Sequence, residues 1–241
     1  MDFILNVLAG LVTGIIVSTF VATRKSLSLY LRFGRVRKVW FPFLRGNAVV
    51  VITGRPGQLP RSTTKVSFSE VLALVELKAF FQRFGSNFDV LNSIDANPSQ
   101  YADKDIILLG SQQANEETEL ISRKIAVPFS YDDHGNLVSQ LGRFPSIPDD
   151  GTLLKEDHAL ILKCNSPYGH ARKVLILAGN HGTATESAVR YMVSPSGIVE
   201  IASKLGSSDF IGILHVDVES NVPKSYKLVT CWKFEEVVNH R

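Results

Sequence analysis

The stretch Leu175 to Met192, LILAGNHGTATESAVRYM, passes from an apolar run through a short polar turn into a segment of small side chains. Short apolar runs that end at glycine are typical of buried strands, and Gly, Asn and Thr are common where a helix begins. The sequence therefore predicts a strand over 173–179, a loop with the letters GNHGTAT, and a helix that starts near Thr183.

Two other parts of the chain follow the same order of strand, polar loop and helix. AVVVIT at 48–53 precedes a helix in which Ser67 and Glu70 form a capping box and which Gly85 ends. DIILLG at 105–110 precedes a helix over 115–125, with Asn115 as its N-cap. In the first of these helices, apolar side chains recur at helical spacing, at Val71, Leu74, Val75, Phe81 and Phe84.

The remaining apolar runs predict antiparallel pairs. HALILKC at 158–164 can pair with the strand over 173–179, and PFSYDDHGNLV forms a hairpin or a loop. FIGILHVDV at 210–218 and SYKLVTCWKF at 225–234 form a terminal hairpin around the turn ESNVPK. The expected fold is α/β: a mixed, mainly parallel Rossmann-like sheet with flanking helices, in a domain over 47–241.

Phe3 to Thr23 is a stretch of 21 residues without a charge. At about 1.5 Å per residue, a helix of this length spans roughly 30 Å, the thickness of the hydrocarbon core of a bilayer. Asp2 precedes the stretch and seven Lys or Arg follow it by Arg45, so the positive-inside rule places the C-terminal side in the cytoplasm. We expect a single-pass protein of an inner or plasma membrane, anchored by residues 1–23. A buried hydrophobic helix is the alternative.

Small side chains recur every four residues in this stretch, at Gly10, Gly14, Ser18 and Ala22. Such a stripe lets two membrane helices approach closely. The sequence predicts a homo-oligomer that forms through Gly10, Gly14 and Ser18. The competing explanation is that Gly and Ala are common in membrane anchors of any kind.

The charge is divided unevenly along the chain. Residues 1–69 hold ten Lys or Arg and one acid, whereas residues 70–241 hold sixteen bases and twenty-two acids. Over 24–46 the bases interleave with Tyr30, Phe33, Trp40, Phe41 and Phe43. Bases and aromatic rings suit a membrane interface that contains anionic lipid. We expect a basic, aromatic juxtamembrane segment and no nucleic-acid partner; DNA binding is the rival explanation.

The chain has two cysteines, Cys164 and Cys231, without the spacing of a metal site. We expect both to be reduced core residues, with one disulfide as the alternative. The sequence contains neither a dinucleotide fingerprint nor a Walker P-loop. It predicts no metal and no cofactor.

Ligands of open α/β sheets bind beyond the carboxyl ends of the strands, where three polar loops of this chain belong. Arginines, amides and glycine-backed N–H groups suit a polyhydroxylated anion such as a nucleotide. The alternative is that they are ordinary turn and cap residues. The predicted ligand-binding residues are Gly54, Arg55 and Arg61 in the first loop, Gly110, Ser111, Gln112 and Asn115 in the second, and Gly179, Asn180, Gly182, Thr183 and Thr185 in the third.

The third loop is the better phosphate site. Glu116 and Glu117 open the helix after the second loop and would repel a phosphate, whereas the third loop has no acid before Glu186 and could use Arg55 or Arg61 as a charge partner. His181 is a candidate general acid or base because imidazole titrates near neutrality. Thr183 and Glu186 fit a capping box, which would direct the Glu186 carboxylate toward its own backbone.

The segment GTATESAVRYM resembles the Gly-Thr-x-x-Glu-x-x-x-Ala helix of nucleoside 2-deoxyribosyltransferases, in which the Glu is the nucleophile on the sugar. Gly182, Thr183 and Glu186 match, whereas the Gly after the Glu is absent and Arg190 stands where Ala is expected. The layout is also similar to TIR-like and SLOG-like domains, which bind or cleave nucleotides in bacterial signalling and immunity. The resemblance implies that Glu186 is catalytic, or that Glu116, Glu117 or Glu119 is the analogue of the TIR-like glutamate.

Three functions follow as expectations. The first is a membrane-anchored sensor or effector whose cytosolic domain binds a nucleotide signal and acts through association of its transmembrane helices, as in antiviral defence. The second is a membrane-tethered enzyme that cleaves the glycosidic bond of nucleosides or NAD, with Glu186 or Glu116 as nucleophile. The third is a membrane scaffold without a ligand.

Overall fold

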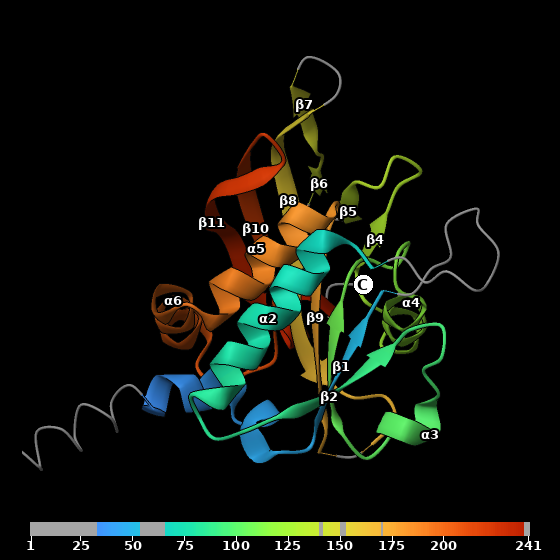
Figure 1. Cartoon of the computed structure of the whole chain (residues 1–241), viewed down its shortest axis with the longest axis vertical. Helices are drawn as coiled ribbons and strands as arrows, with labels where there is room; N and C mark the ends of the chain where they lie inside the picture. The colour runs from blue at the N-terminus through green and yellow to red at the C-terminus, as the bar shows by residue number, and fades with distance from the viewer. Residues whose placement is uncertain (1–32, 54–65, 140–141, 150–152, 170, 239–241) are drawn as a thin grey trace, which may run out of the picture.

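The computed structural model describes residues 33–53, 66–139, 142–149, 153–169 and 171–238 (Figure 1). The predicted anchor over 1–23, with Gly10, Gly14 and Ser18, lies outside these ranges, and so do Gly54, Arg55 and Arg61. Among the residues that are described, no helix combines the length and the apolar character needed to cross a bilayer. The anchor and the oligomer through its small-residue stripe therefore stay predictions.

One half of the main sheet is parallel. Its strands are β1 (Ala48–Ile52), β2 (Phe88–Asn92), β3 (Asp105–Leu109) and β9 (Lys173–Gly179), in the order β9-β3-β1-β2. Every residue of β3 is buried, as expected for a parallel strand covered on both faces. The three predicted strand–loop–helix units are confirmed, because α2 (Phe68–Gln82), α4 (Glu116–Lys124) and α5 (Gly182–Val193) follow β1, β3 and β9.

The other half of the sheet is antiparallel. β8 (Leu153–Asn165) pairs with β9, with the short β7 (Ile147–Asp149) and with β10 (Phe210–Glu219), and β10 pairs with β11 (Val222–Lys233). The predicted pair and the terminal hairpin are thus confirmed, and the sheet is mixed. The hairpin turn is tighter than predicted. Ser220 and Asn221 both have positive φ, at 53° and 60°, which is typical of two-residue turns that match the twist of the strands.

Helices cover both faces of the sheet. α2 and α5 pack side by side in one apolar core, which includes Ala73, Leu77, Ala184 and Ala188. α4 and the short α3 (Pro98–Tyr101) contribute Ile121 and Tyr101 to the core on the other face. A second, three-stranded sheet of β4 (Phe129–Tyr131), β5 (Leu137–Ser139) and β6 (Gly142–Phe144) also packs there, which confirms the hairpin within PFSYDDHGNLV. α6 (Pro195–Leu205) packs against α5, and α7 (Phe234–Val238) follows β11.

The capping box of α2 and its glycine end are confirmed. Ser67 accepts from the Glu70 amide while Glu70 accepts from the Ser67 amide. At the other end, Gly85 has a φ of 65° and the Ser86 amide donates to the Phe81 carbonyl, a Schellman arrangement. The buried face differs from the apolar spacing in the sequence. Val71 and Val75 are 44% and 59% exposed, whereas the buried apolar residues are Ala73, Leu77, Phe80 and Phe81.

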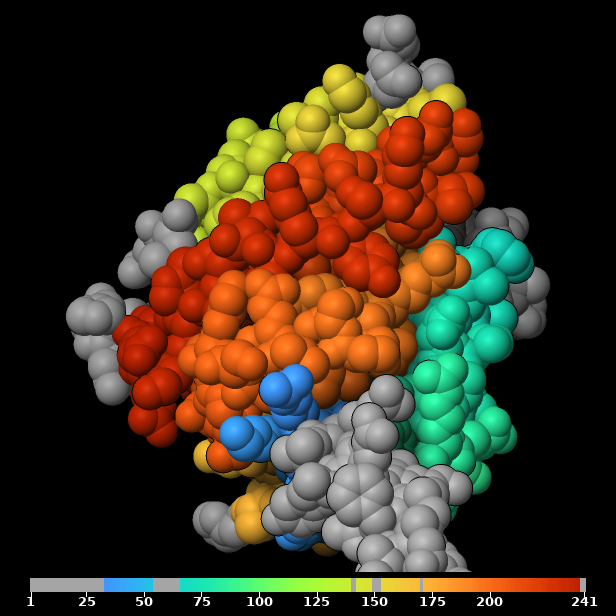
Figure 2. Space-filling model, turned by 90° about the vertical axis from the view of Figure 1, so that its left-hand side faces the viewer, coloured from blue at the N-terminus to red at the C-terminus, as the bar shows by residue number. Residues whose placement is uncertain are grey.

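Residues 33–40 form a helix, followed by the 3-10 turn η1 (Phe43–Arg45). Val36, Val39, Trp40 and Phe43 enter the same core as α2 and α5. Figure 2 shows this part of the chain, in blue, against the orange surface of α5 and α6. The expectation that Trp40 and Phe43 lie at a membrane interface is therefore wrong. Their spacing of i, i+4 and i+7 from Val36 forms a helical stripe, and the folded core begins upstream of residue 47.

Candidate functional site

The start of α5 lies directly beside the start of α2, at the carboxyl edge of the parallel strands. A Cβ atom added to Gly182 would lie 3.2 Å from the Cβ of Ser69 and 3.3 Å from the Oγ of Ser67. Two helix N-termini therefore meet at this edge, each with a partial positive charge from its dipole. Of the three loops predicted to bind a ligand, this contact brings together the third loop and the residues that follow the first.

The turn between β9 and α5 is held by its own backbone. A Cβ atom on Gly179 would lie 2.5 Å from both the Thr185 amide nitrogen and the His181 carbonyl oxygen, so only glycine fits. The Gly179 amide donates to Thr185 Oγ1 at 2.9 Å. Gly179 and Thr185, both predicted to bind a ligand, thus have a structural role in closing the turn.

Asn180 connects this turn to the three-stranded sheet. Its Nδ2 donates to the Phe144 carbonyl at 2.9 Å and to Ser146 Oγ at 3.1 Å. Its Oδ1 accepts from the Leu137 amide at 2.9 Å. Both amide N–H groups are used within the protein, and the side chain is left with one acceptor lone pair at most for a ligand.

His181 lies against a buried carboxylate. Its Nδ1 is 3.5 Å from Asp157 Oδ2 and 3.1 Å from Ser146 Oγ, while its side chain is 47% exposed. Asp157 has no exposed surface, and its other oxygen accepts from Ser146 Oγ at 2.8 Å. The pKa of His181 is raised above 6.5, first by hydrogen bonding to Asp157 and against the opposing effect of burial. Within the described residues no hydrogen bond of Nε2 is found, and the contacts of the ring with Ser146 and Asp157 are all made by Nδ1.

Asp157 and Ser146 are functional candidates that the sequence reasoning missed. Asp157 lies in β8 on the same side of the strand as Ala159 and Ile161, which are buried. A carboxylate at a core-facing position of a strand is costly unless it has partners, and this was the signal available in the sequence. Thr183 is one of those partners, since its Oγ1 donates to Asp157 Oδ2 at 3.4 Å.

The predicted capping box of Thr183 and Glu186 is wrong. His181 is the N-cap of α5, with extended dihedral angles, and its side chain accepts no capping hydrogen bond. The helix therefore begins two residues earlier than the box requires, and Thr183 lies inside its first turn. The N-termini of α2, α4 and α6, in contrast, are each capped by a side chain. The first N–H groups of α5, which have no partner within the helix, are thus left without a side-chain cap.

Glu186 lies between α5 and α2. It is 3% exposed, and its Oε1 is 2.7 Å from Arg190 Nη2, one helical turn further along. Burial raises the pKa of Glu186, while Arg190 and a hydrogen bond from Ser69 lower it. The carboxylate that was predicted to be either a cap or a nucleophile is instead buried and paired with Arg190, whose side chain is 36% exposed.

The loop between β3 and α4 turns its side chains inward. Asn115 is fully buried, its Nδ2 donates to the carbonyls of Leu109 and Val51, and its Oδ1 accepts from two amides of α4. Gly110 has a φ of 101°, and a Cβ there would lie 2.7 Å from Thr53 Oγ1. Ser111 is buried, and Gln112 Nε2 donates to the Phe129 carbonyl at 3.5 Å. These predicted ligand residues serve mainly to join β1, β3, α4 and β4.

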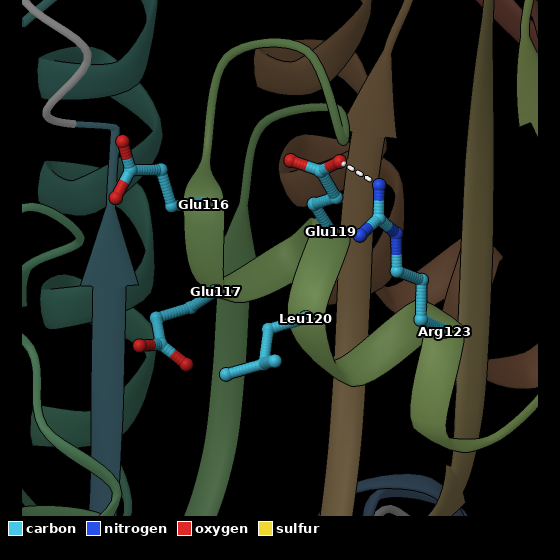
Figure 3. Close-up of a pocket in the computed structure, with 5 residues that line it drawn as sticks. All are labelled: Glu116, Glu117, Glu119, Leu120 and Arg123. Atoms are coloured by element: carbon cyan, nitrogen blue, oxygen red, sulfur yellow. Dashed lines mark hydrogen bonds and ion pairs between the residues drawn. The ribbon is translucent and has the colours of Figure 1, made fainter.

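A cavity of about 330 Å³ lies at the start of α4, lined by Glu116, Glu117, Glu119, Leu120 and Arg123 (Figure 3). Glu119 and Arg123 are joined at 2.7 Å on one side of the helix, while Glu116 and Glu117 project from the other. Glu117 accepts from the Tyr101 hydroxyl, and burial raises the pKa of Glu117. Glu116 is exposed. Three carboxylates against one guanidinium make the cavity unfavourable for a phosphate.

The arrangement therefore separates the predicted catalytic residues. His181 lies with Gly182, Thr183 and Asp157 at the start of α5, Glu186 is buried along the same helix, and Glu116 belongs to the cavity on α4. Over the described ranges, no group of His, Cys, Asp or Glu could hold a metal ion. Cys164 and Cys231 are free, as predicted, with Cys164 buried and Cys231 partly buried.

No protein-family model matches the chain, and no curated protein sequence matches it.

Proposed function

We propose that the protein is a membrane-anchored sensor whose α/β domain binds a nucleotide-type ligand at the start of α5. Support comes from the uncapped first turn of α5 next to His181, because helix N–H groups without a cap bind phosphate and His181, whose pKa the neighbouring Asp157 raises, adds a positive charge when it is protonated. The first turn of α5 contains no acid. Arg55 and Arg61, the predicted charge partners, lie outside the described residues, and the proposal does not depend on them.

The observation that carries the sensor proposal is the path of α5. The helix begins at Gly182, at the candidate site, and its last turn contacts the helix over 33–40, where Trp40 Nε1 donates to the Met192 carbonyl at 2.9 Å. Residues 33–40 are the first described residues after the predicted anchor. A shift of α5 on ligand binding would therefore move the segment that leads to the membrane. α5 thus physically connects the candidate ligand site to the helix over 33–40, and we propose that ligand binding is coupled to the membrane segment through this helix.

Calorimetric titration of the full chain in detergent with a panel of nucleotides tests the binding step. We expect at least one nucleotide to bind, and His181→Ala to weaken it by roughly tenfold, the usual effect of losing one charge-assisted hydrogen bond. His134→Ala is the matched control, since His134 is an exposed histidine in the turn between β4 and β5. If the His181 variant and the wild type bind the nucleotide with equal affinity, the assignment of the binding site to the start of α5 is wrong.

A membrane-tethered enzyme acting on nucleosides or NAD is the second proposal. The observation that favours it is the pair of His181 and Asp157, because a carboxylate behind one imidazole nitrogen leaves the other free for proton transfer. Glu186, the nucleophile that the resemblance implies, is bound to Arg190 and is nearly inaccessible. Assays of NAD and nucleoside cleavage separate the two proposals. Turnover that His181→Gln abolishes and Glu186→Gln leaves intact would replace the sensor by an enzyme that uses His181.

A further inference from the structure

The segment 33–46 carries four exposed bases and no acid. They are Arg35, Arg37, Lys38 and Arg45, and we refer to residues 33–46 as the basic segment. Its apolar side chains Val36, Val39, Trp40 and Phe43 are fixed in the core, so the backbone that carries the bases is held in place. Lys163 in β8 also holds the basic segment in place, because its Nζ donates to the Lys38 carbonyl at 3.5 Å.

Two of these bases stack on one aromatic ring. The guanidinium carbons of Arg37 and Arg45 lie 4.6 Å and 4.2 Å from the centroid of the Phe41 ring. A guanidinium that stacks on a ring keeps its N–H donors in its own plane, where they are free to bind a phosphate or a carboxylate. The stack therefore holds two sets of donors next to each other at the protein surface.

The four bases have no carboxylate within ion-pair distance among the described residues. Several bases elsewhere in the domain have such a partner, for example Lys104 with Asp89 at 2.9 Å and Lys173 with Asp209 at 2.7 Å. Holding cations close together without a counter-ion is electrostatically unfavourable, and an anionic partner removes that cost. The lack of a carboxylate partner among the described residues thus favours an anionic partner outside the chain.

The basic segment lies at the end of α2 that is remote from the candidate site. Phe33, 50% exposed, packs on Phe84 just beyond the end of α2, and Trp40 packs on Phe80, whereas Gly182 contacts Ser67 and Ser69 at its start. α2 has 15 residues, which corresponds to about 22 Å at the usual rise per residue. Figure 1 shows residues 33–45 near the lower edge of the sheet and the start of α5 near the opposite edge.

We propose that the basic segment docks on the surface of an anionic bilayer, with the guanidinium groups of Arg37 and Arg45 bound to lipid phosphates. Charge complementarity favours this partner, and the chain that precedes Phe33 contains the uncharged stretch of residues 3–23. Docking in this way orients the start of α5 away from the bilayer, where a ligand in solution reaches it. The inference rests on the membrane location in the proposed function, and it is independent of the ligand site.

Native mass spectrometry of the full chain in detergent tests the proposal, with dioctanoyl phosphatidylglycerol and dioctanoyl phosphatidylcholine as probes. We expect the anionic phosphatidylglycerol to bind more tightly than the zwitterionic phosphatidylcholine. In the double variant Arg37→Gln, Arg45→Gln, the affinity for phosphatidylglycerol should fall roughly tenfold or more. The matched control is the double variant Arg123→Gln, Arg143→Gln, which removes two exposed arginines paired with Glu119 and Asp132. Phe41→Leu should weaken binding less, because it removes the stacking surface and keeps the charges.

Three results would overturn the proposal. The first is equal binding of the two lipids, or an unchanged affinity of the Arg37 and Arg45 variant. The second is displacement of the lipid by inorganic phosphate at a similar concentration, which would identify a site for free phosphate. The third is tighter binding of a short DNA or RNA oligonucleotide through the same arginines, which would make nucleic acid the partner. None of these results bears on nucleotide binding at His181, so a failure here is distinct from a failure of the ligand site.

Discussion

Trp40 Nε1 donates a hydrogen bond to the Met192 carbonyl at 2.9 Å and joins the helix over 33–40 to the last turn of α5. The carbonyls in the last turn of a helix have no partner within it, so Trp40 satisfies one that would otherwise be buried and unpaired. Both residues are almost fully buried. A connection that satisfies a buried polar group fixes the position of the two helices relative to each other.

Replacing Trp40 by Phe removes this hydrogen bond and part of the indole volume. We expect the free energy of unfolding to fall by about 2 kcal/mol, the range for a buried acceptor left unpaired. Urea unfolding of the full chain in detergent, followed by circular dichroism, measures the loss. Trp232→Phe is the control, since it removes the other tryptophan of the chain, which packs against the core on the opposite face of the sheet from α5. A loss no larger than that of the control would contradict the role of the bond.

Gly179→Ala tests the tight turn before α5. The added methyl group would lie 2.5 Å from two backbone atoms, a contact that neither can avoid without moving the helix. We expect a destabilisation of more than about 2 kcal/mol and weaker nucleotide binding. Gly34→Ala is the matched control, because nothing lies within 4 Å of its added Cβ and Ala is the better helix former. Thermal unfolding of both variants measures the contrast, and similar melting temperatures would refute this explanation of Gly179.

The charge of His181 predicts a pH dependence of binding. Its pKa is raised above 6.5 by Asp157, so the stabilisation from the charged pair is complete below pH 6.5 and is lost as the pH rises through the folded-state value. Affinity for an anionic nucleotide should fall over the same interval. Asp157→Asn should move the transition toward 6.5, and NMR titration of the imidazole resonances measures the shift. A transition that does not move would show that Asp157 has no influence on the ring.

Lys163 is a buried cation beside the helix over 33–40, where its Nζ donates to the Lys38 carbonyl. It is 2% exposed, and burial lowers its pKa from 10.5 to about 8. The unfolded chain therefore binds more protons between these values, and stability should rise as the pH increases from about 8 to 10.5. Lys163→Met should stabilise the protein at neutral pH by up to about 3 kcal/mol. The loss of the two hydrogen bonds that Lys163 Nζ donates would reduce this gain. Urea unfolding against pH is the measurement. Lys227→Met, at an exposed position, serves as control, and a destabilised Lys163 variant would contradict the prediction.

The parts of the fold predicted from the sequence have strong local signals. The apolar runs of β1, β3 and β9 are followed by polar loops, and Ser67 and Asn115 cap α2 and α4 as their residue types indicate. β2 and α6 were missed because their local signals conflict with their structure. β2 contains Asp89 and Asn92 and lies at the edge of the sheet, and α6 begins with Pro195 and Gly197, which also suit a turn.

The candidate site was only partly predictable, for a different reason. The loop GNHGTAT identified the place, since His181 and Gly182 lie at the edge where helix N-termini meet. Whether Thr183 or His181 is the N-cap depends on a shift of two residues that capping patterns do not determine. Asp157 precedes the loop by more than 20 residues, and its contact with His181 depends on the pairing of β8 with β9. Burial of Trp40 depends likewise on the packing of α5.

The most direct test of the sensor proposal is a fluorescence titration of the full-chain Trp232→Phe variant, in which Trp40 is the only tryptophan. We expect a nucleotide bound at the start of α5 to change the emission of Trp40, and we expect this change to saturate with the calorimetric binding curve. His181→Ala in the same background should shift both curves to higher concentration. Binding that leaves the Trp40 emission unchanged, or that His181→Ala does not affect, would contradict the sensor proposal.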